Sequence, residues 1–113
     1  MIKSSAEKFV WTRHAQDKLR YYRLSESRIK RIIRYPVRVE EGILEGAVAA
    51  MSPAGGKKYS EIWTMYLITA NRKMQSANRK KQIKIITAWR YPGKSPERDP
   101  IPAEILREIK SLL

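Results

Sequence analysis

The sequence predicts a single α+β domain, in which two N-terminal helices pack on a curled antiparallel sheet of three to four strands and a C-terminal helix follows. Three observations support this fold class. Apolar residues recur at helical spacing in residues 13–34 and again in residues 103–113, whereas they alternate within residues 37–91. The chain of 113 residues suits one hydrophobic core. Helices and strands that are segregated along the chain are typical of the α+β class.

The first helix is expected from Arg13 to about Tyr22, with Thr12 as its N-cap. Ala15, Leu19 and Tyr22 recur at i, i+4 and i+7, which places them on one apolar side. This side is therefore predicted to face the sheet.

The second helix is expected to begin after Ser25, which is a suitable N-cap, and to end at about Arg34 because Pro36 follows. Its inward side carries three isoleucines, Ile29, Ile32 and Ile33. The two helices together form the predicted N-terminal layer.

Four strands are expected after the helices, over residues 37–43, 47–51, 61–70 and 82–91. The last two are joined by the basic segment 71–81, which makes an antiparallel hairpin. Its second strand is expected to carry Ile83, Ile85, Thr87, Trp89 and Tyr91 on one face.

The strand over residues 61–70 is apolar on both faces, so each face needs a cover. The N-terminal helices cover one face. Either the last helix, expected over residues 103–113, or a second copy of the chain in a homodimer covers the other. Residues 92–113 are predicted to be a C-terminal extension of the single domain 1–113.

The charge balance favours a polyanionic partner. The chain has 24 Lys and Arg against 11 Asp and Glu, a net charge of +13. Such an excess raises the local concentration of polyanions, among which nucleic acid is the first candidate. An anionic membrane surface and an acidic protein are the alternatives, and the interpretation adopted is nucleic acid without membrane binding.

The cations are concentrated in residues 1–35 and 71–94, and aromatic residues are interleaved with them. Arginine binds phosphate, and an aromatic ring offers a stacking surface to an unpaired base. RNA is therefore favoured over DNA. The predicted nucleic-acid-binding residues are Arg13, Arg20, Tyr21, Arg23, Arg28, Arg31, Arg72, Lys73, Arg79, Lys80 and Lys81.

Residues 11–36 resemble the opening of an uncharacterised family of small bacterial and archaeal proteins. The resemblance rests on Trp11-Thr12-Arg13-His14-Ala15, Leu19-Arg20, Leu24-Ser25, Ile29, Ile32 and Pro36. In that family a His-Ala pair begins the first helix and an Arg-x-Ile-Ser segment begins the second, where this chain has Arg23-Leu24-Ser25. The family is similar, at a distance, to the RelE, ParE and BrnT group of toxins.

This resemblance implies a RelE-like fold and a place in a toxin–antitoxin system. Several toxins of the group are metal-independent ribonucleases partnered by an antitoxin, whereas ParE-like members act on gyrase. For this chain the resemblance implies an RNA-directed toxin, with metal-independent endoribonuclease activity as the enzyme hypothesis and an acidic antitoxin-like protein as the partner.

His14, Lys18, Arg90 and Tyr91 are the candidate catalytic residues. Metal-free RNA cleavage needs a base, an acid and cations near the phosphorus. His14, Lys18 and Tyr21 share one helical stripe, and Arg90 and Tyr91 resemble by position the strand-end residues of the toxins. Three alternatives stay open: His14 docks its helix, the chain is a non-enzymatic RNA- or DNA-binding module, or its basic groove binds an acidic protein.

No cofactor and no metal are expected. The sequence has one histidine, no cysteine and scattered acids, and its Gly55-Gly56 segment lacks the spacing of a phosphate-binding loop. Residues 1–10 lack the apolar run of a signal peptide, so a cytoplasmic location is expected.

Overall fold

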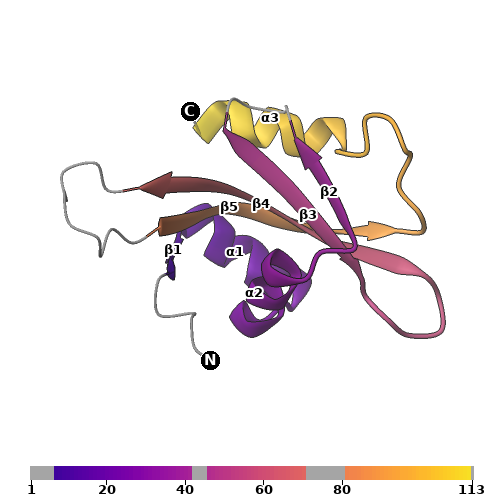
Figure 1. Ribbon diagram of the computed structural model, residues 1–113. Coiled ribbons are helices and arrows are strands. Elements are labelled where there is room, and N and C mark those ends of the chain that lie inside the picture. The colour runs from indigo at the N-terminus through magenta and orange to yellow at the C-terminus, as the bar shows by residue number, and fades with distance from the viewer. Residues whose placement is uncertain (1–6, 42–45, 71–80, 113) are drawn as a thin grey trace.

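The computed structural model describes residues 7–41, 46–70 and 81–112, which form three helices and one five-stranded sheet (Figure 1). The α+β class and the positions of the two N-terminal helices and the C-terminal helix are confirmed. None of these three helices has the length and apolar character needed to cross a bilayer. In chain order the elements are β1 (Glu7–Trp11), α1 (Arg13–Tyr22), α2 (Glu26–Arg34), β2 (Arg38–Glu41), β3 (Ala47–Pro53), β4 (Ser60–Ala70), β5 (Lys81–Pro92) and α3 (Ala103–Leu112).

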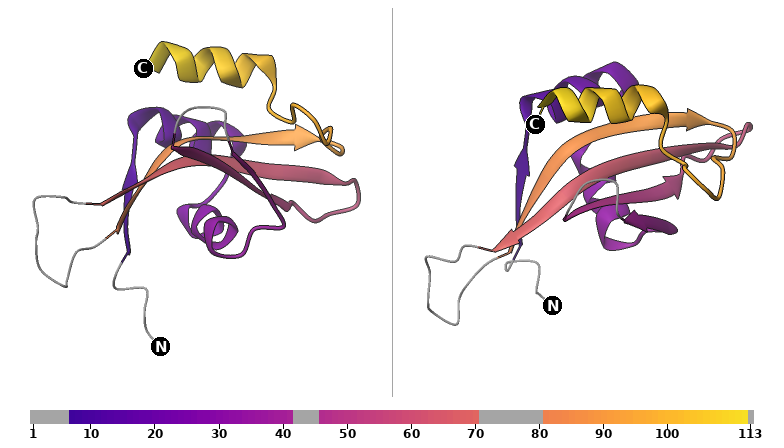
Figure 2. Two further views of the ribbon diagram at one scale, coloured as in Figure 1. Left: turned by 45° about the horizontal axis from the view of Figure 1, so that its top comes forward. Right: turned by 90° about the horizontal axis from the view of Figure 1, so that it is seen from above.

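The sheet differs from the prediction of three to four curled antiparallel strands. Its order is β1-β5-β4-β3-β2, and β1 pairs with β5 in parallel while the other neighbours are antiparallel. The sheet is mixed and not strongly curled (Figure 2). The direction of β1 was not predictable from a turn, because most of the chain separates it from β5. Helices on both faces keep the sheet an open middle layer.

Two hydrophobic cores lie on the two faces of the sheet. The prediction that β4 is apolar on both faces is confirmed, because Ile62 and Tyr66 face α1 and α2 while Trp63 and Met65 face α3. Figure 1 shows α3 on one side of the sheet and α1 and α2 on the other. The last helix therefore covers the second face through Ile105 and Ile109, together with Ile101 just before it.

A β-bulge in β5 changes which of its residues face each core. Thr87 is paired with Met65 but Ile85 with Tyr66, so Ile86 is an extra residue in β5. Ile83 and Ile85 consequently join the first core, whereas Trp89 and Tyr91 face α3. The prediction that these side chains share one face is wrong, because strict alternation fails where a residue is inserted.

Thr12 ties the start of α1 to this bulge. Its Oγ1 accepts a hydrogen bond from the Ala15 N–H at 3.0 Å, which is the predicted N-cap. The same hydroxyl donates to the carbonyl of Ile86 at 3.1 Å, and the Thr12 N–H donates to the carbonyl of Ile85 at 3.2 Å. The hydroxyl of Ser25, the predicted cap of α2, accepts from the Arg28 N–H and has no tertiary partner among the described residues. Both N-caps are confirmed, and Thr12, the cap of α1, also joins the helix to β5.

Thr12→Ala is expected to lower the free energy of unfolding by about 2 kcal/mol, since it removes an N-cap and a partner of the bulge carbonyl. Ser25→Ala, which removes a cap alone, should cost about 1 kcal/mol. Thr12→Ser keeps the hydroxyl and should recover most of the loss. Urea unfolding at pH 7 measures all three, and equal costs for Thr12→Ala and Ser25→Ala would contradict the tertiary role.

Candidate nucleic-acid interface

The two helical layers differ in charge. Residues 13–34, which contain α1 and α2, carry eight Lys and Arg but only two acids. Residues 93–112, which lead into and form α3, carry four of each. Because the sheet separates α2 from α3 (Figure 1), one side of the molecule is strongly basic and the other is balanced. The basic side is the one that a polyanion would approach.

A shallow pocket opens on the basic side, along α2. Its volume is about 270 Å³, and its lining residues are Ser27, Lys30, Arg31, Arg34 and Tyr35. The first four recur at i, i+3, i+4 and i+7, so they share one face of α2. Tyr35 follows the helix and its N–H donates to the Arg31 carbonyl, yet the residue is 75% exposed. The site therefore combines cations, a hydroxyl and an accessible ring.

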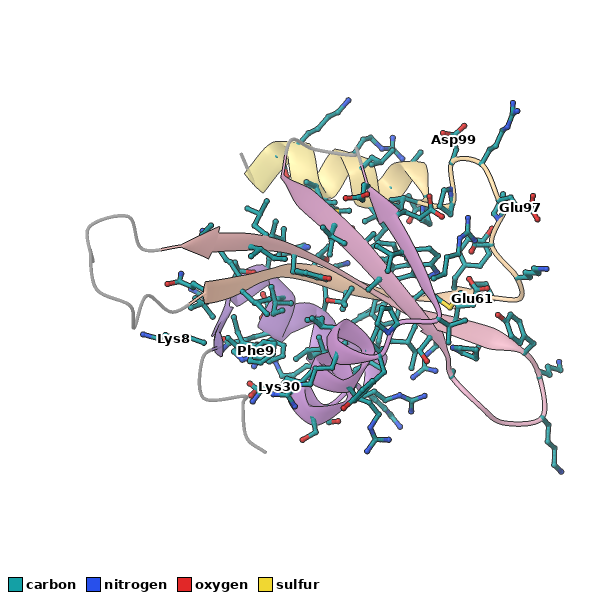
Figure 3. The ribbon with its side chains drawn as sticks, viewed as in Figure 1. Lys8, Phe9, Lys30, Glu61, Glu97 and Asp99 are labelled. Atoms are coloured by element: carbon teal, nitrogen blue, oxygen red, sulfur yellow. The ribbon has the colours of Figure 1, made fainter. Side chains whose placement is uncertain are left out.

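Phe9 of β1 holds two of these cations in place. The Lys30 Nζ lies 5.2 Å from the centre of the Phe9 ring, and the Arg34 guanidinium carbon lies 5.6 Å from it. Figure 3 shows Phe9 beside Lys30, with Lys8 nearby. Within the described residues, Lys30 and Arg31 have no ion pair with a carboxylate. The charge of Lys30 is positioned by the Phe9 ring, which does not neutralise it.

The predicted binding residues of α1 and α2 lie on the surface. Arg13, Arg20, Tyr21, Arg23, Arg28 and Arg31 are all exposed. Arg20 is paired with Asp17, and Arg28 donates to the Ala54 carbonyl at 2.6 Å. Arg72, Lys73, Arg79 and Lys80 lie outside the described residues, as does the side chain of Lys81. The predicted binding residues omitted Ser27, Lys30, Arg34 and Tyr35, although the spacing of the first three on one helix was readable.

His14 and Lys18 of α1 contact Glu108 of α3. The Lys18 Nζ donates to Glu108 Oε2 at 3.2 Å and lies 3.1 Å from Oε1. The His14 Nε2 lies 3.4 Å from Oε1, is shielded from solvent and has no hydrogen-bond partner in the described part of the chain. The predicted stripe thus forms a seam between two helices, and Lys18 also lies 5.6 Å from the centre of the Tyr21 ring.

Arg90 and Tyr91 lie away from this seam and from each other. Arg90 Nη2 donates to the carbonyl of Tyr22, at the end of α1, at 3.2 Å. His14 is eight residues earlier, about 12 Å along the helix axis. Tyr91 points to the opposite face of the sheet, where it packs on the second core. The structure therefore brings together His14 and Lys18, and it does not bring Arg90 and Tyr91 to them.

Glu61 is a buried carboxylate that the sequence analysis did not single out. It lies on β4, is 1% exposed, and accepts four hydrogen bonds (Figure 3). The Ser95 hydroxyl and N–H donate at 2.6 and 3.3 Å, Trp63 Nε1 donates at 3.0 Å, and the Tyr59 hydroxyl donates at 2.9 Å. Both of its oxygens are occupied, so this network anchors residues 93–97 to the sheet.

Arg38 extends the same network from β2. Its guanidinium donates to the Ser95 hydroxyl and to the carbonyls of Pro96 and Glu97, and its Nε donates to Glu40. It also lies 5.4 Å from the centre of the Trp63 ring. Arg38 is therefore a structural residue of the α3 side and is not available to a phosphate.

A larger pocket, of about 360 Å³, lies between β2 and the start of α3. Glu40, Glu41 and Asp99 line it together with Lys110. Three carboxylates disfavour a phosphate there. Over the residues that the structure describes, no three His, Asp or Glu side chains are grouped as a metal site requires.

Comparisons of the chain with protein families, with curated proteins and with solved structures give no match. The resemblance of residues 11–36 to the toxin group stays a prediction. The function is accordingly argued from the charges and contacts of the two helical layers.

The Glu61 network gives the folded state a defined pH dependence. Burial raises the pKa of Glu61, but the hydrogen bonds from Ser95, Trp63 and Tyr59 outweigh burial and lower it below the usual 4.5. A carboxyl whose pKa is lowered on folding stabilises the protein above its unfolded pKa. This stabilisation is lost as the pH falls through the folded value.

Glu61→Gln is expected to remove this part of the pH dependence while keeping the fold, because a side-chain amide still accepts from Ser95 and Trp63. At pH 7 it should cost about 1–3 kcal/mol in free energy of unfolding. The gap between wild type and variant should narrow between about pH 5 and pH 3. A gap in urea unfolding that stays constant over this range would contradict the assignment.

Proposed function

We propose that this protein is an RNA-binding domain whose α1–α2 layer binds the phosphate backbone. The observation that carries the proposal is the cation-rich α2 surface, where Lys30 and Arg31 have no carboxylate partner among the described residues. Phosphate contacts supply most of the affinity of a protein for nucleic acid. Because the charge of the α3 side is balanced, RNA is expected to bind on the α1–α2 side.

RNA with unpaired bases fits this surface better than duplex DNA. Tyr21 and Tyr35 are 76% and 75% exposed on the basic layer. Exposure of an aromatic ring to water is unfavourable, and stacking of a base on the ring removes this cost. Duplex DNA hides the faces of its bases, whereas single-stranded RNA presents them. The ligand class supported best is therefore single-stranded RNA.

Binding without cleavage is the activity that the geometry favours. Glu108 neutralises Lys18 and covers His14, and Arg90 is held at the far end of α1. The second candidate is a metal-independent, toxin-like ribonuclease. One observation favours it: His14 and Lys18 do lie side by side, so displacement of Glu108 would expose an acid–base pair.

The double variant Lys30→Ala/Arg31→Ala is expected to weaken binding of a single-stranded 12-nucleotide RNA at least about tenfold at ~100 mM salt, since charged hydrogen bonds are lost. The slope of log affinity against log salt should fall by about 0.7 for each phosphate contact removed. Fluorescence anisotropy measures both quantities.

Arg107→Ala/Lys110→Ala is the matched control, because it removes the same charge from exposed positions on α3. It should change affinity less than about twofold, since the two charges are far from the ligand relative to the Debye length. Equal losses in the two double variants would assign binding to net charge alone. Absence of RNA binding by the wild type would overturn the proposal.

Incubation of the wild type with single-stranded RNA in EDTA is expected to leave the RNA intact, because His14 and Lys18 are engaged with Glu108. Gel analysis with His14→Ala in parallel provides the test. RNA cleavage by the wild type that disappears in His14→Ala would show the ribonuclease to be the correct function.

A further inference from the structure

An exposed apolar strip begins at the α2 pocket. Tyr35 lines the pocket, and Val37 and Val39 follow it at intervals of two residues. All three are unusually open to solvent, and Val37 is 67% exposed. The Val37 N–H donates to the Met51 carbonyl at 2.8 Å, so the strip is held on the edge of the sheet.

The strip and the pocket lie on the same side of the sheet. Arg38 points to the α3 side, where it contacts Trp63. Val39, the next residue of β2, therefore points to the side of α2, because successive side chains of a strand alternate. An anion in the pocket would have the Tyr35 ring beside it, and Val37 and Val39 follow Tyr35 along the chain.

This arrangement selects a particular ligand chemistry. Lys30 and Arg31 suit a dianionic or diester phosphate, and the Ser27 hydroxyl is a further donor on the same helical face. The pocket volume, about 270 Å³, is below the ~300 Å³ at which ordinary small-molecule sites begin. It suits a phosphate with its adjoining sugar, while a flat base is left outside, over the Tyr35 ring.

We infer that the α2 pocket and Tyr35 form a subsite for one unpaired nucleotide, in which Lys30 and Arg31 bind the phosphate and Tyr35 stacks on the base. The inference rests on the proposed RNA binding and deepens it. It makes Tyr35 the residue that distinguishes a single strand from a duplex, whose bases are already stacked on each other. The aliphatic strip then contacts the sugar or base of the next nucleotide.

Tyr35→Ala and Tyr35→Phe, compared on two ligands, test the subsite. The ligands are a labelled single-stranded 12-nucleotide RNA and a strand of equal length made of abasic residues, which keeps the phosphates and lacks the bases. Tyr35→Ala should weaken binding of the RNA by about 5- to 150-fold, the range for loss of one stacked base, and leave binding of the abasic strand unchanged. Tyr35→Phe keeps the ring and should bind both ligands like the wild type.

Other outcomes have distinct meanings. If the wild type binds the RNA and Tyr35→Ala binds it equally well, the subsite is overturned and the proposed function stands. If the wild type binds neither strand, both are overturned. Equal weakening on the two strands would make Tyr35 a general contact and contradict base stacking.

If Tyr35→Ala keeps full RNA affinity but dissociates a dimer in light scattering, the strip belongs to an interface between two copies. A circular-dichroism melt of each variant shows that the fold is retained.

Discussion

The insertion of Ile86 into β5 is the constraint on which both helical layers depend. Before the bulge β5 contributes Ile83 and Ile85 to the core beneath α1 and α2, and after it the strand contributes Trp89 to the core beneath α3. Because Ile86 is inserted, the odd-numbered residues of β5 face the first core before the bulge and the second core after it, where Ala88 continues the first core. Thr12 binds the carbonyl at the break, so the start of α1 is placed where the strand changes faces.

From Thr12, α1 packs on the first core and contacts α3, whereas the cations that are proposed to bind RNA lie on α2. Ala15 and Leu19 turn towards the first core, and the neighbouring stripe meets α3 through Glu108. The acids of residues 93–112 lie on the α3 side of the sheet. The cations of α2 lie on the other side. With a Debye length of about 8 Å at physiological salt, the two sides are electrostatically separate at the range over which a phosphate is attracted.

Local features of this fold were predictable, and features made by distant residues were not. The caps Thr12 and Ser25 were predicted correctly, because an N-cap depends on a few adjacent residues. The parallel pairing of β1 and the bulge at Ile86 were missed, since both are settled by register against strands far along the chain. Glu61 was missed for the same reason, as its main donor, Ser95, is 34 positions away. Of the pocket, Arg31 was predicted from the sequence, whereas Lys30 was omitted, and its position depends on the distant ring of Phe9.

The single histidine shows how tertiary contacts change the interpretation of a titratable residue. In the sequence His14 is a candidate acid–base group beside Lys18, on the stripe next to the buried one. In the structure Glu108 covers both side chains, and the Nε2 of His14 is shielded from solvent. A general base needs direct access to the proton that it removes, so this seam in its closed form joins two helices. The α2 surface needs no such rearrangement, because Arg31 and Tyr35 are already exposed. Pre-organisation therefore favours binding at α2 over chemistry at α1.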